Sequence, residues 1–305
     1  MDHYRIKEII KDAGATAVGI ARVTEVDAAA RESYQRWIES GRSRPLDYMD
    51  RYHDVRENPG LLLEGARSII VAAFSYFYPA PKAKSHFYIA RYARGADYHD
   101  VVRRRLTDAV STITTETGLG STDFRVCVDT APLRERYWAR QAGVGFIGRN
   151  NALIIPGEGS YMVLGEILTT MELKADSPCT LSCGDCNACV KACPSAALGS
   201  DSDGYMSVDA SRCLSCLTIE CRGELPTGTT LGGRIAGCDT CQDVCPHNRY
   251  AKPSSIAEFA PSNPLLDMTD SEILALRPED IRPLTRHTAL SRIKPSDFIR
   301  NIHTP

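Results

Sequence analysis

Cysteine spacing is the feature that most constrains this chain of 305 residues. Twelve cysteines are present; only Cys127 lies outside the block from Cys179 to Cys245. The charged N-terminus is followed by no apolar signal region, so a secreted disulfide framework is not expected. Crowded cysteines in such a chain indicate metal binding. The most apolar run, Ile69 to Phe74, is too short to span a bilayer, and we expect a cytoplasmic protein without membrane segments.

The first cysteine run has the spacing of ferredoxins that hold two clusters. It reads Cys183-x2-Cys186-x2-Cys189-x3-Cys193-Pro194. In that pattern three cysteines bind one [4Fe–4S] cluster and the fourth binds the other. A second run, Cys238-x2-Cys241-x3-Cys245-Pro246, repeats the last three positions and has Ile235 where the first cysteine would stand.

These spacings predict most of the ligands. Cluster I takes Cys183, Cys186, Cys189 and Cys245, and cluster II takes Cys193, Cys238 and Cys241. The eighth ligand is Cys213, Cys216 or Cys221, and spacing does not choose among them. Zinc ribbons also use paired C-x2-C elements, but two Cys-Pro endings favour iron–sulfur clusters. Cys127, in an apolar strand, is expected to be a buried hydrophobe, and Cys179 is left without a role.

The remaining sequence divides around this cysteine block. Residues 1–176 alternate helical and strand patterns and predict an α/β or α+β domain; a ferredoxin-like domain is expected over 177–249 and a helical tail packed on the core over 250–305. Strands are predicted over 17–23, 68–75 and 124–128, with helices over 97–117 and 132–142. Residues 151–156 and 161–169 are expected to pair around a Gly-Glu-Gly-Ser turn. With 43% hydrophobic residues the chain can bury a core, and its formal charge of −2 gives no global signal for nucleic acid.

Three further motifs have both an ordinary and a functional interpretation. Gly143-x-Gly145-x-x-Gly148 matches a dinucleotide fingerprint, but it follows a helix, so a loop of close backbone approach is expected. Asp129 lies between a predicted strand and a predicted helix. The sequence favours a role as helix N-cap, and the alternative is a carboxylate in a ligand site. Asp97-Tyr98-His99 lacks the glycine of a cobalt-binding D-x-H-x-x-G element, and capping by Asp97 beside a half-exposed His99 is expected.

Beyond these motifs, nearly the whole chain resembles the epoxyqueuosine reductase family, cobalamin-dependent iron–sulfur enzymes of tRNA modification. The resemblance is carried by segments 94–99, 128–132, 142–150, 159–161, 165–168, 212–220 and 237–248, which include Arg-Gly-Ala-Asp-Tyr-His, Val-Asp-Thr-Ala-Pro, Arg-Cys-Leu-Ser and Gly-Cys-Asp-Thr-Cys-Gln. The family's Arg-Cys-x-Ser cysteine falls on Cys213, which would make Cys213 the fourth ligand of cluster II. Its proposed proton donor falls on Asp129, which reverses the N-cap interpretation.

The resemblance also implies a cobalamin site over the N-terminal domain. Implied contacts are Arg56, Ala90, Asp129, Leu153, Leu164, Ser215, Cys238, Asp239, Thr240 and Cys241. No cobalt-ligating histidine motif is present, which implies a base-off corrinoid without a protein ligand. Cluster I would receive electrons from a donor that the sequence does not identify, and cluster II would pass them to cobalt.

The implied reaction is reduction of epoxyqueuosine at the wobble position of a tRNA anticodon loop, carried out by a monomer. Longer family members continue into helical repeats that help hold tRNA, and this chain resembles a short form without them. Two other functions agree with the cysteine pattern. One is a corrinoid reductase of a small molecule, similar to a reductive dehalogenase, and the other is an electron-transfer protein without substrate chemistry.

Overall fold

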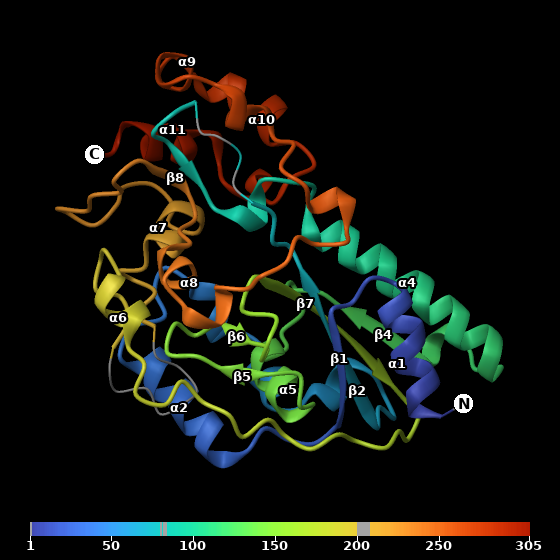
Figure 1. Ribbon diagram of the computed structural model, residues 1–305. Helices are drawn as coiled ribbons and strands as arrows, with labels where there is room; N and C mark the ends of the chain where they lie inside the picture. The colour runs from blue at the N-terminus through green and yellow to red at the C-terminus, as the bar shows by residue number, and fades with distance from the viewer. Residues whose placement is uncertain (1, 80, 82–83, 200–207) are drawn as a thin grey trace.

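A four-stranded antiparallel sheet organises the N-terminal part of the molecule. The computed structural model describes residues 2–79, 81, 84–199 and 208–305 (Figure 1). The strand order is β1 (Ala17–Arg22), β2 (Ser68–Ser75), β7 (Met162–Thr169) and β4 (Phe124–Cys127), and each neighbouring pair is antiparallel. Three strand predictions are confirmed, β2 to the residue. This domain was predicted to be α/β or α+β, and its antiparallel sheet places it in the α+β class.

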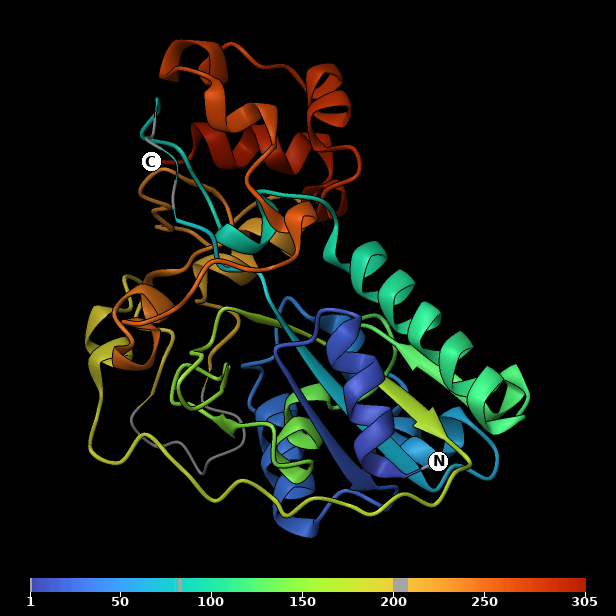
Figure 2. The ribbon, with the colours of Figure 1, turned by 45° about the vertical axis from the view of Figure 1, so that its right-hand side comes forward.

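Helices cover both faces of this sheet, and each face has its own core. On one face α1 (His3–Asp12) lies beside α4 (Tyr98–Thr117), as Figures 1 and 2 both show. Leu106 and Ile113 of α4 are completely buried there. On the opposite face α5 (Glu135–Gln141) buries Trp138 against β1, β2 and β7, with α2 (Ala28–Glu39) adding Ala30.

Two expectations about the segment from 129 to 169 are wrong. The helix expected from Pro132 begins at Glu135, because residues 128–133 form two tight turns instead, in which Thr130 N–H donates to Val128 O and Leu133 N–H to Ala131 O. The strands expected to pair with each other also separate. β6 (Leu153–Ile154) pairs with β5 (Phe146–Ile147), whereas the apolar β7 is buried in the middle of the main sheet.

A short parallel pair connects the N-terminal part to the cysteine-rich part. β3 (Tyr88–Ile89) pairs with β8 (Arg234–Ala236), and the predicted cluster ligands Cys238 and Cys241 follow β8 directly. The cysteine-rich part also contains α6 (Ala188–Ala192), α7 (Leu214–Ile219) and α8 (Thr240–Asp243). This pairing places the cluster cysteines next to the N-terminal sheet.

The C-terminal segment forms a third layer over this junction. It contains α9 (Asp270–Leu274), α10 (Pro278–Thr285) and α11 (Pro295–His303), at the top of Figure 1. Phe298 of α11 packs in one core with Ile89 of β3 and Ile235 of β8. The helical tail expected over 250–305 therefore contains helices packed on the core. Within the described ranges, no helix has both the length and the apolar character needed to cross a membrane.

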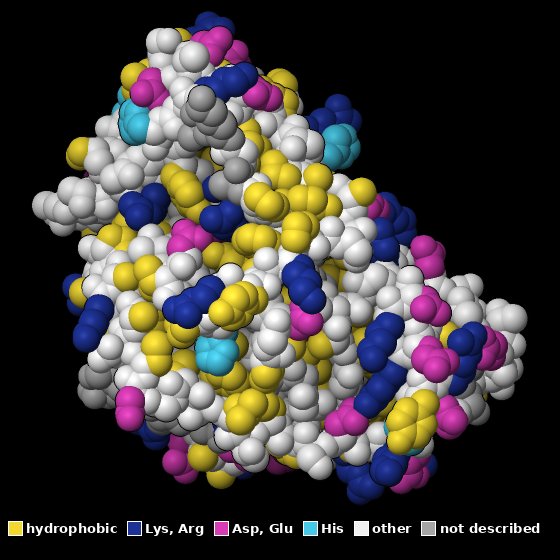
Figure 3. All heavy atoms as spheres, viewed as in Figure 1, with side chains coloured by type: hydrophobic (Ala, Val, Ile, Leu, Met, Phe, Trp, Pro, Cys, Tyr) yellow, Lys and Arg dark blue, Asp and Glu magenta, His cyan; other side chains and the backbone are white. Residues whose placement is uncertain are grey.

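The arginine run of α4 is engaged in ion pairs. Arg104 and Arg105 both contact Glu258, at 2.6 Å and 3.1 Å. At the other end of the helix Glu116 pairs with Arg5 at 2.8 Å. Basic and acidic side chains are accordingly interspersed over α1 and α4 at the right of Figure 3. On that face these helices therefore present no uniformly basic surface.

Candidate functional site

A cavity of about 780 Å³ lies where the N-terminal sheet, the cysteine-rich part and the C-terminal segment meet. Its size falls in the range usual for cofactor and ligand sites. The N-terminal part contributes Tyr98, His99 and Asp129 to its walls, the cysteine-rich part Cys238, and the C-terminal segment Arg292. One cavity therefore brings the predicted proton donor and a predicted cluster II ligand together.

Most of the residues predicted to contact cobalamin line this cavity. They are Arg56, Asp129, Leu153, Leu164, Ser215, Cys238 and Cys241. Leu153 and Leu164 are at most 7% exposed and present apolar surface. A flat apolar macrocycle with polar side groups requires apolar walls combined with a few polar groups, and this set provides both. The residues present therefore fit the implied cofactor.

Three of the predicted contacts do not line the cavity. Ala90 is fully buried, and its N–H donates to Ala236 O. Asp239 is 2% exposed and accepts hydrogen bonds from the Tyr88 hydroxyl and the Arg91 N–H, both at 2.7 Å. Thr240 accepts a hydrogen bond from Arg234. These residues lie outside the cavity lining and stabilise the backbone around the predicted cluster II cysteines.

Asp129 follows β4 and projects into the cavity from an unusual backbone conformation. Its φ of 52° lies in the left-handed region, which few residues other than glycine adopt. Its N–H donates to Glu135 Oε1 at 2.6 Å, and its Oδ2 lies 3.0 Å from Nε2 of His99. The N-cap position of α5 is Arg134. The helix-cap interpretation of Asp129 is therefore wrong, because its carboxylate faces His99 instead.

His99, in the first turn of α4, joins two carboxylates. Asp97 is the N-cap of α4, as expected, and its Oδ1 accepts the His99 N–H at 3.0 Å. The same oxygen lies 2.6 Å from His99 Nδ1, while Nε2 reaches Asp129. With both ring nitrogens engaged by carboxylates, His99 has no nitrogen lone pair to offer a metal. The sequence predicts only a half-exposed His99 beside Asp97, because the contact of His99 with Asp129 joins distant parts of the chain.

Hydrogen bonds among three side chains determine which of them are charged. They are Asp97, His99 and Asp129. Burial lowers the pKa of His99, but its hydrogen bonds to Asp129 and Asp97 outweigh burial and raise the pKa to about 9. Burial likewise raises the pKa of Asp129, but the hydrogen bond and charge of His99 hold it below its usual value. At neutral pH the pair is therefore an imidazolium facing a carboxylate.

The wall facing Asp129 contains an ion pair from two other parts of the chain. Arg292 contacts Glu220 through its Nε at 2.5 Å and through a second nitrogen at 2.9 Å. The guanidinium of Arg292 also lies over the ring of Tyr48, 5.4 Å from its centroid. Arg292 adds positive charge that lowers the pKa of Asp129. Sequence analysis identified none of these three residues.

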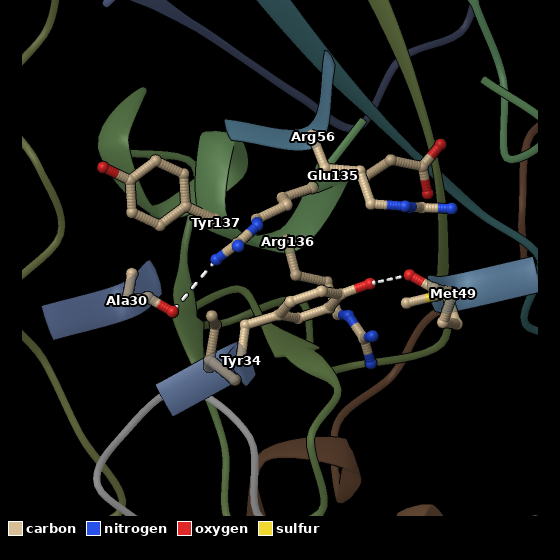
Figure 4. A pocket seen from close by; sticks show the side chains of 9 residues that line it. Ala30, Tyr34, Met49, Arg56, Glu135, Arg136 and Tyr137 are labelled. Atoms are coloured by element: carbon tan, nitrogen blue, oxygen red, sulfur yellow. Dashed lines mark hydrogen bonds between the residues drawn. The ribbon is translucent and has the colours of Figure 1, made fainter. Parts of the chain in front are cut away.

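A smaller pocket of about 100 Å³ adjoins the main cavity (Figure 4). Both share Met49, Arg56, Glu135 and Arg136 in their linings. Figure 4 shows the Tyr34 hydroxyl donating to the Met49 carbonyl, at 2.7 Å. Arg56, the last basic residue of α3 (His53–Glu57), donates to Arg51 O at 3.0 Å and Tyr48 O at 3.3 Å. Arg56 therefore holds the segment carrying Tyr48 against the cavity.

The four cysteines predicted for cluster I surround one small space. Cys183, Cys186, Cys189 and Cys245 line a cavity of about 20 Å³. Burial raises the pKa of Cys189, and the neighbouring Cys183 and Cys245 raise it further. Cys186 is exposed. Four converging thiols are the ligand set that a [4Fe–4S] cluster requires, with one edge at the molecular surface.

The predicted cluster II cysteines form a second group at the base of the large cavity. Burial raises the pKa of Cys213, and Cys238 and Cys193 raise it further. Burial also raises the pKa of Cys241, followed by the effects of Cys213 and Cys238. Cys213, Cys238 and Cys241 all line the cavity. This grouping supports Cys213 as the eighth ligand, the choice that cysteine spacing leaves open.

The other cysteines have different surroundings. Cys216 also lines the cavity, but burial, Cys213, Glu220 and Cys221 are what raise its pKa. Cys127 of β4 is 3% exposed, as expected for a buried hydrophobe. The Cys221 Sγ lies 3.5 Å from Glu224 O.

The Gly143 to Gly148 loop is a site of close backbone approach, as predicted. A Cβ atom on Gly145 would lie 2.4 Å from Ile154 O, and one on Gly143 would lie 2.6 Å from Ser177 O. The loop carries β5, which pairs with β6 and so positions Leu153 at the cavity. Its glycines therefore serve packing.

Comparison with protein families gives two matches in this chain. The model "Epoxyqueuosine reductase QueG, DUF1730" matches residues 56–130. The model "4Fe-4S double cluster binding domain" matches residues 182–248, and confirms the two-cluster prediction.

Curated relatives match along nearly the whole chain. An epoxyqueuosine reductase from a Synechococcus species is 37% identical over 97% of this chain and 93% of that relative. The epoxyqueuosine reductase of Pseudomonas aeruginosa is 34% identical over 99% of this chain and 85% of that relative.

Solved structures agree with the fold. A crystal structure of an epoxyqueuosine reductase with an epoxyqueuosine-modified tRNA-Tyr stem loop superposes with a TM-score of 0.85, at 29% identity over 98% of this chain and 79% of that chain. The Bacillus subtilis enzyme, at 28% identity over the same shares of the two chains and also a TM-score of 0.85, is described with its catalytic aspartate loop swung out of the active site.

Proposed function

This chain belongs to the epoxyqueuosine reductase family, and we propose that it reduces epoxyqueuosine to queuosine at the wobble position of tRNA. The observation that carries the proposal is the shared cavity. Asp129 and the cluster II cysteines Cys213, Cys238 and Cys241 line the same space, so a proton donor and an electron source meet there. An electron carrier without substrate chemistry needs no such arrangement.

Two [4Fe–4S] clusters and cobalamin are the cofactors of this reaction. The cysteines of the two groups above would hold the clusters, and the seven predicted contacts that line the large cavity would hold cobalamin. When bound, these groups supply the two electrons that the reduction consumes. The protein's task is to position the substrate, exclude water and deliver protons.

Proton delivery is the role of Asp129 and His99. Opening the epoxide and releasing its oxygen as water consumes two electrons and two protons. The Asp129 carboxyl group gives a proton to the leaving oxygen as a general acid. His99 stores that proton while the site is empty, because its pKa is about 9, and it returns the proton to Asp129 through the 3.0 Å contact. Asp97 holds the ring in the orientation that this transfer needs.

The substrate is a nucleotide of an anticodon loop. Bases of single-stranded loops can leave their stack and enter a protein pocket. A related enzyme has been crystallised with an epoxyqueuosine-modified stem loop, which supports the same class of partner here. We place the reaction in the cytoplasm, where such a tRNA is modified, and assign it to a monomer.

Electrons enter at cluster I. Cys186 is exposed, whereas the cluster II group lies at the base of the cavity, so a donor protein can approach cluster I more closely. The chemical identity of the donor does not follow from these residues.

Anaerobic reconstitution tests the proposal. The purified chain is loaded with iron, sulfide and cobalamin, reduced chemically, and mixed with tRNA that carries epoxyqueuosine. Nucleoside mass spectrometry should show queuosine, and an aryl halide offered in parallel should stay intact. Turnover of the halide with indifference to tRNA would instead indicate a small-molecule corrinoid reductase. Failure of the loaded protein to change either substrate would indicate a pure electron-transfer protein.

A further inference from the structure

Glu166 is a completely buried carboxyl group in the middle of the main sheet. It lies on β7, directly opposite Val71 of β2 and Cys127 of β4, and is 0% exposed. Among the residues that the structure describes, no N–H or hydroxyl group donates to either of its carboxyl oxygens. An ionised carboxylate in such a place would be strongly destabilising, so the group must be neutral in the folded protein.

Glu135 connects Glu166 to the site. It is the first residue of α5, the helix that covers this face of the sheet. Glu135 Oε1 accepts the Asp129 N–H at 2.6 Å, and its side chain lines both the large cavity and the small pocket of Figure 4. Helix α5 packs against β7, the strand that carries Glu166, and Glu135 contributes to the raised pKa of Glu166. Two acidic groups therefore adjoin each other directly behind the Asp129 loop.

The surroundings of the two groups favour a shared proton. Burial and then the neighbouring Asp129 raise the pKa of Glu135 to about 8, although the cationic Arg136 and His99 act in the opposite direction. Burial and then Glu135 and Asp129 raise the pKa of Glu166 well above its usual value. Glu166 in turn raises the pKa of Cys127. Two adjacent carboxyl groups that cannot both ionise behave as one proton-holding unit.

We propose that Glu135 and Glu166 hold one proton behind Asp129 and release it through Glu135 as the second of the two protons that epoxide reduction consumes. This inference rests on the proposed function. The substrate epoxide takes two electrons from the bound cofactors, both of its carbon–oxygen bonds break, and a carbon–carbon double bond forms. Asp129 protonates the oxygen first. The stored proton then passes from Glu135, which lines the same cavity as Asp129, to the same oxygen and completes the water molecule, and bulk water reloads the pair after product release.

Replacing Glu166 with glutamine tests this assignment. Glu166→Gln keeps the shape and neutrality of the buried group but cannot give up a proton. Infrared difference spectroscopy of the folded, cobalamin-free protein reports a protonated carboxyl group through a carbonyl stretch that a carboxylate lacks. Wild type should show this band at pH 7, Glu166→Gln should weaken it because Glu135 still holds a proton, and the double variant Glu135→Gln with Glu166→Gln should lose it. Thr169→Ser, at a buried position of the same strand, is the control and should keep the band.

Kinetics of the reconstituted enzyme supply the second readout. Glu166→Gln should lower kcat by about a hundredfold with an unchanged KM for tRNA, since loss of a proton donor affects chemistry and not binding. The alkaline fall of kcat near pH 8 reports loss of the stored proton, and in the variant it should move to about pH 9, where His99 loses its own proton. Glu135→Gln should cause the same changes in kcat and in its pH dependence, with the same KM. It serves as the test variant if Glu166→Gln does not fold.

The outcomes separate this inference from the proposed function. A wild-type protein without the infrared band, or a Glu166→Gln variant with wild-type kcat and pH profile, would overturn the proton-storing pair. A wild-type protein that shows the band but leaves epoxyqueuosine tRNA unchanged would instead overturn the proposed function, and the second proton would then have no reaction to serve.

Discussion

Nε2 of His99 lies 3.0 Å from Oδ2 of Asp129, at the edge of a cavity that also exposes cluster II cysteines. The two residues come from different elements, the first turn of α4 and the turn after β4. Their contact converts an isolated carboxylate into one half of a proton-sharing pair. It also explains why Asp129, which follows a strand in a left-handed conformation, has a fixed carboxylate orientation.

Replacement of His99 should change both catalysis and the pH dependence of stability. The pKa of His99 is raised in the folded state, so its stabilising effect is complete below pH 6.5 and is lost as the pH rises through about 9. His99→Gln should therefore be less stable than wild type by on the order of 2 kcal/mol at pH 6 and nearly equal at pH 10, measured by urea unfolding. A difference that does not vary with pH would contradict the charged pair. kcat should fall about a hundredfold.

Replacement of Asp129 should remove chemistry while leaving the cofactors in place. Asp129→Asn cannot protonate the leaving oxygen, and we expect single-turnover rates to fall about a thousandfold. Cluster and cobalamin absorbance should stay at wild-type levels, because the asparagine has the same shape. Asp108→Asn, at an exposed position of α4, is the matched control. Wild-type rates in Asp129→Asn would rule out Asp129 as the general acid.

Serine variants should distinguish the eighth cluster ligand. Cys213→Ser should lower the iron content from about eight to about four atoms per chain and remove one cluster signal from the electron paramagnetic resonance spectrum. Cys216→Ser, three residues along and facing the same cavity, should retain both. The reverse result would assign the ligand to Cys216 and contradict the grouping of Cys213 with Cys238 and Cys193.

A methyl group at Gly145 should disturb the cavity wall. The added Cβ would lie 2.4 Å from the carbonyl oxygen of Ile154, and backbone cannot move away as a side chain does. Gly145→Ala should cost about 2 kcal/mol of stability and weaken cobalamin binding, since Leu153 precedes Ile154 in β6. Gly120→Ala, whose Cβ would meet the side chain of Thr122 at 3.3 Å, should be nearly neutral. Differential scanning calorimetry and cobalamin titration measure the two effects.

Local patterns in the sequence were sufficient for several elements. The apolar residues repeated along 97–117 predict α4, which ends at Thr117 and is capped by Gly118 with a φ of 74°. The cysteine spacing likewise predicts which thiols group together, because cluster geometry requires a fixed separation along the chain. In both cases the determining interactions connect residues a few positions apart.

The expectations that failed depend on contacts between distant segments. An aspartate before a helix commonly caps it. The residues next to Asp129 in the sequence do not indicate that its carboxylate contacts His99 instead. The partner of β7 was also misassigned, because a neighbouring apolar segment is the simplest candidate, whereas burial inside the sheet between β2 and β4 satisfies both edges of β7. Glu166 lies in a segment that carries the family resemblance, but nothing there predicts its burial, since a glutamate in a strand is ordinarily exposed.

The parallel pairing of β3 with β8 has a consequence for the order of assembly. Tyr88 and Ile89 precede most of the chain, while their partners Arg234 and Ala236 come after five of the eight predicted cluster cysteines and before Cys238, Cys241 and Cys245. During synthesis the N-terminal sheet can close once β7 emerges, but β3 waits for β8, and such distant pairings form late. The N-terminal sheet is therefore expected to be complete before the cavity gains the wall that carries the predicted cluster cysteines. Insertion of the clusters is then expected to be the step that fixes the final structure.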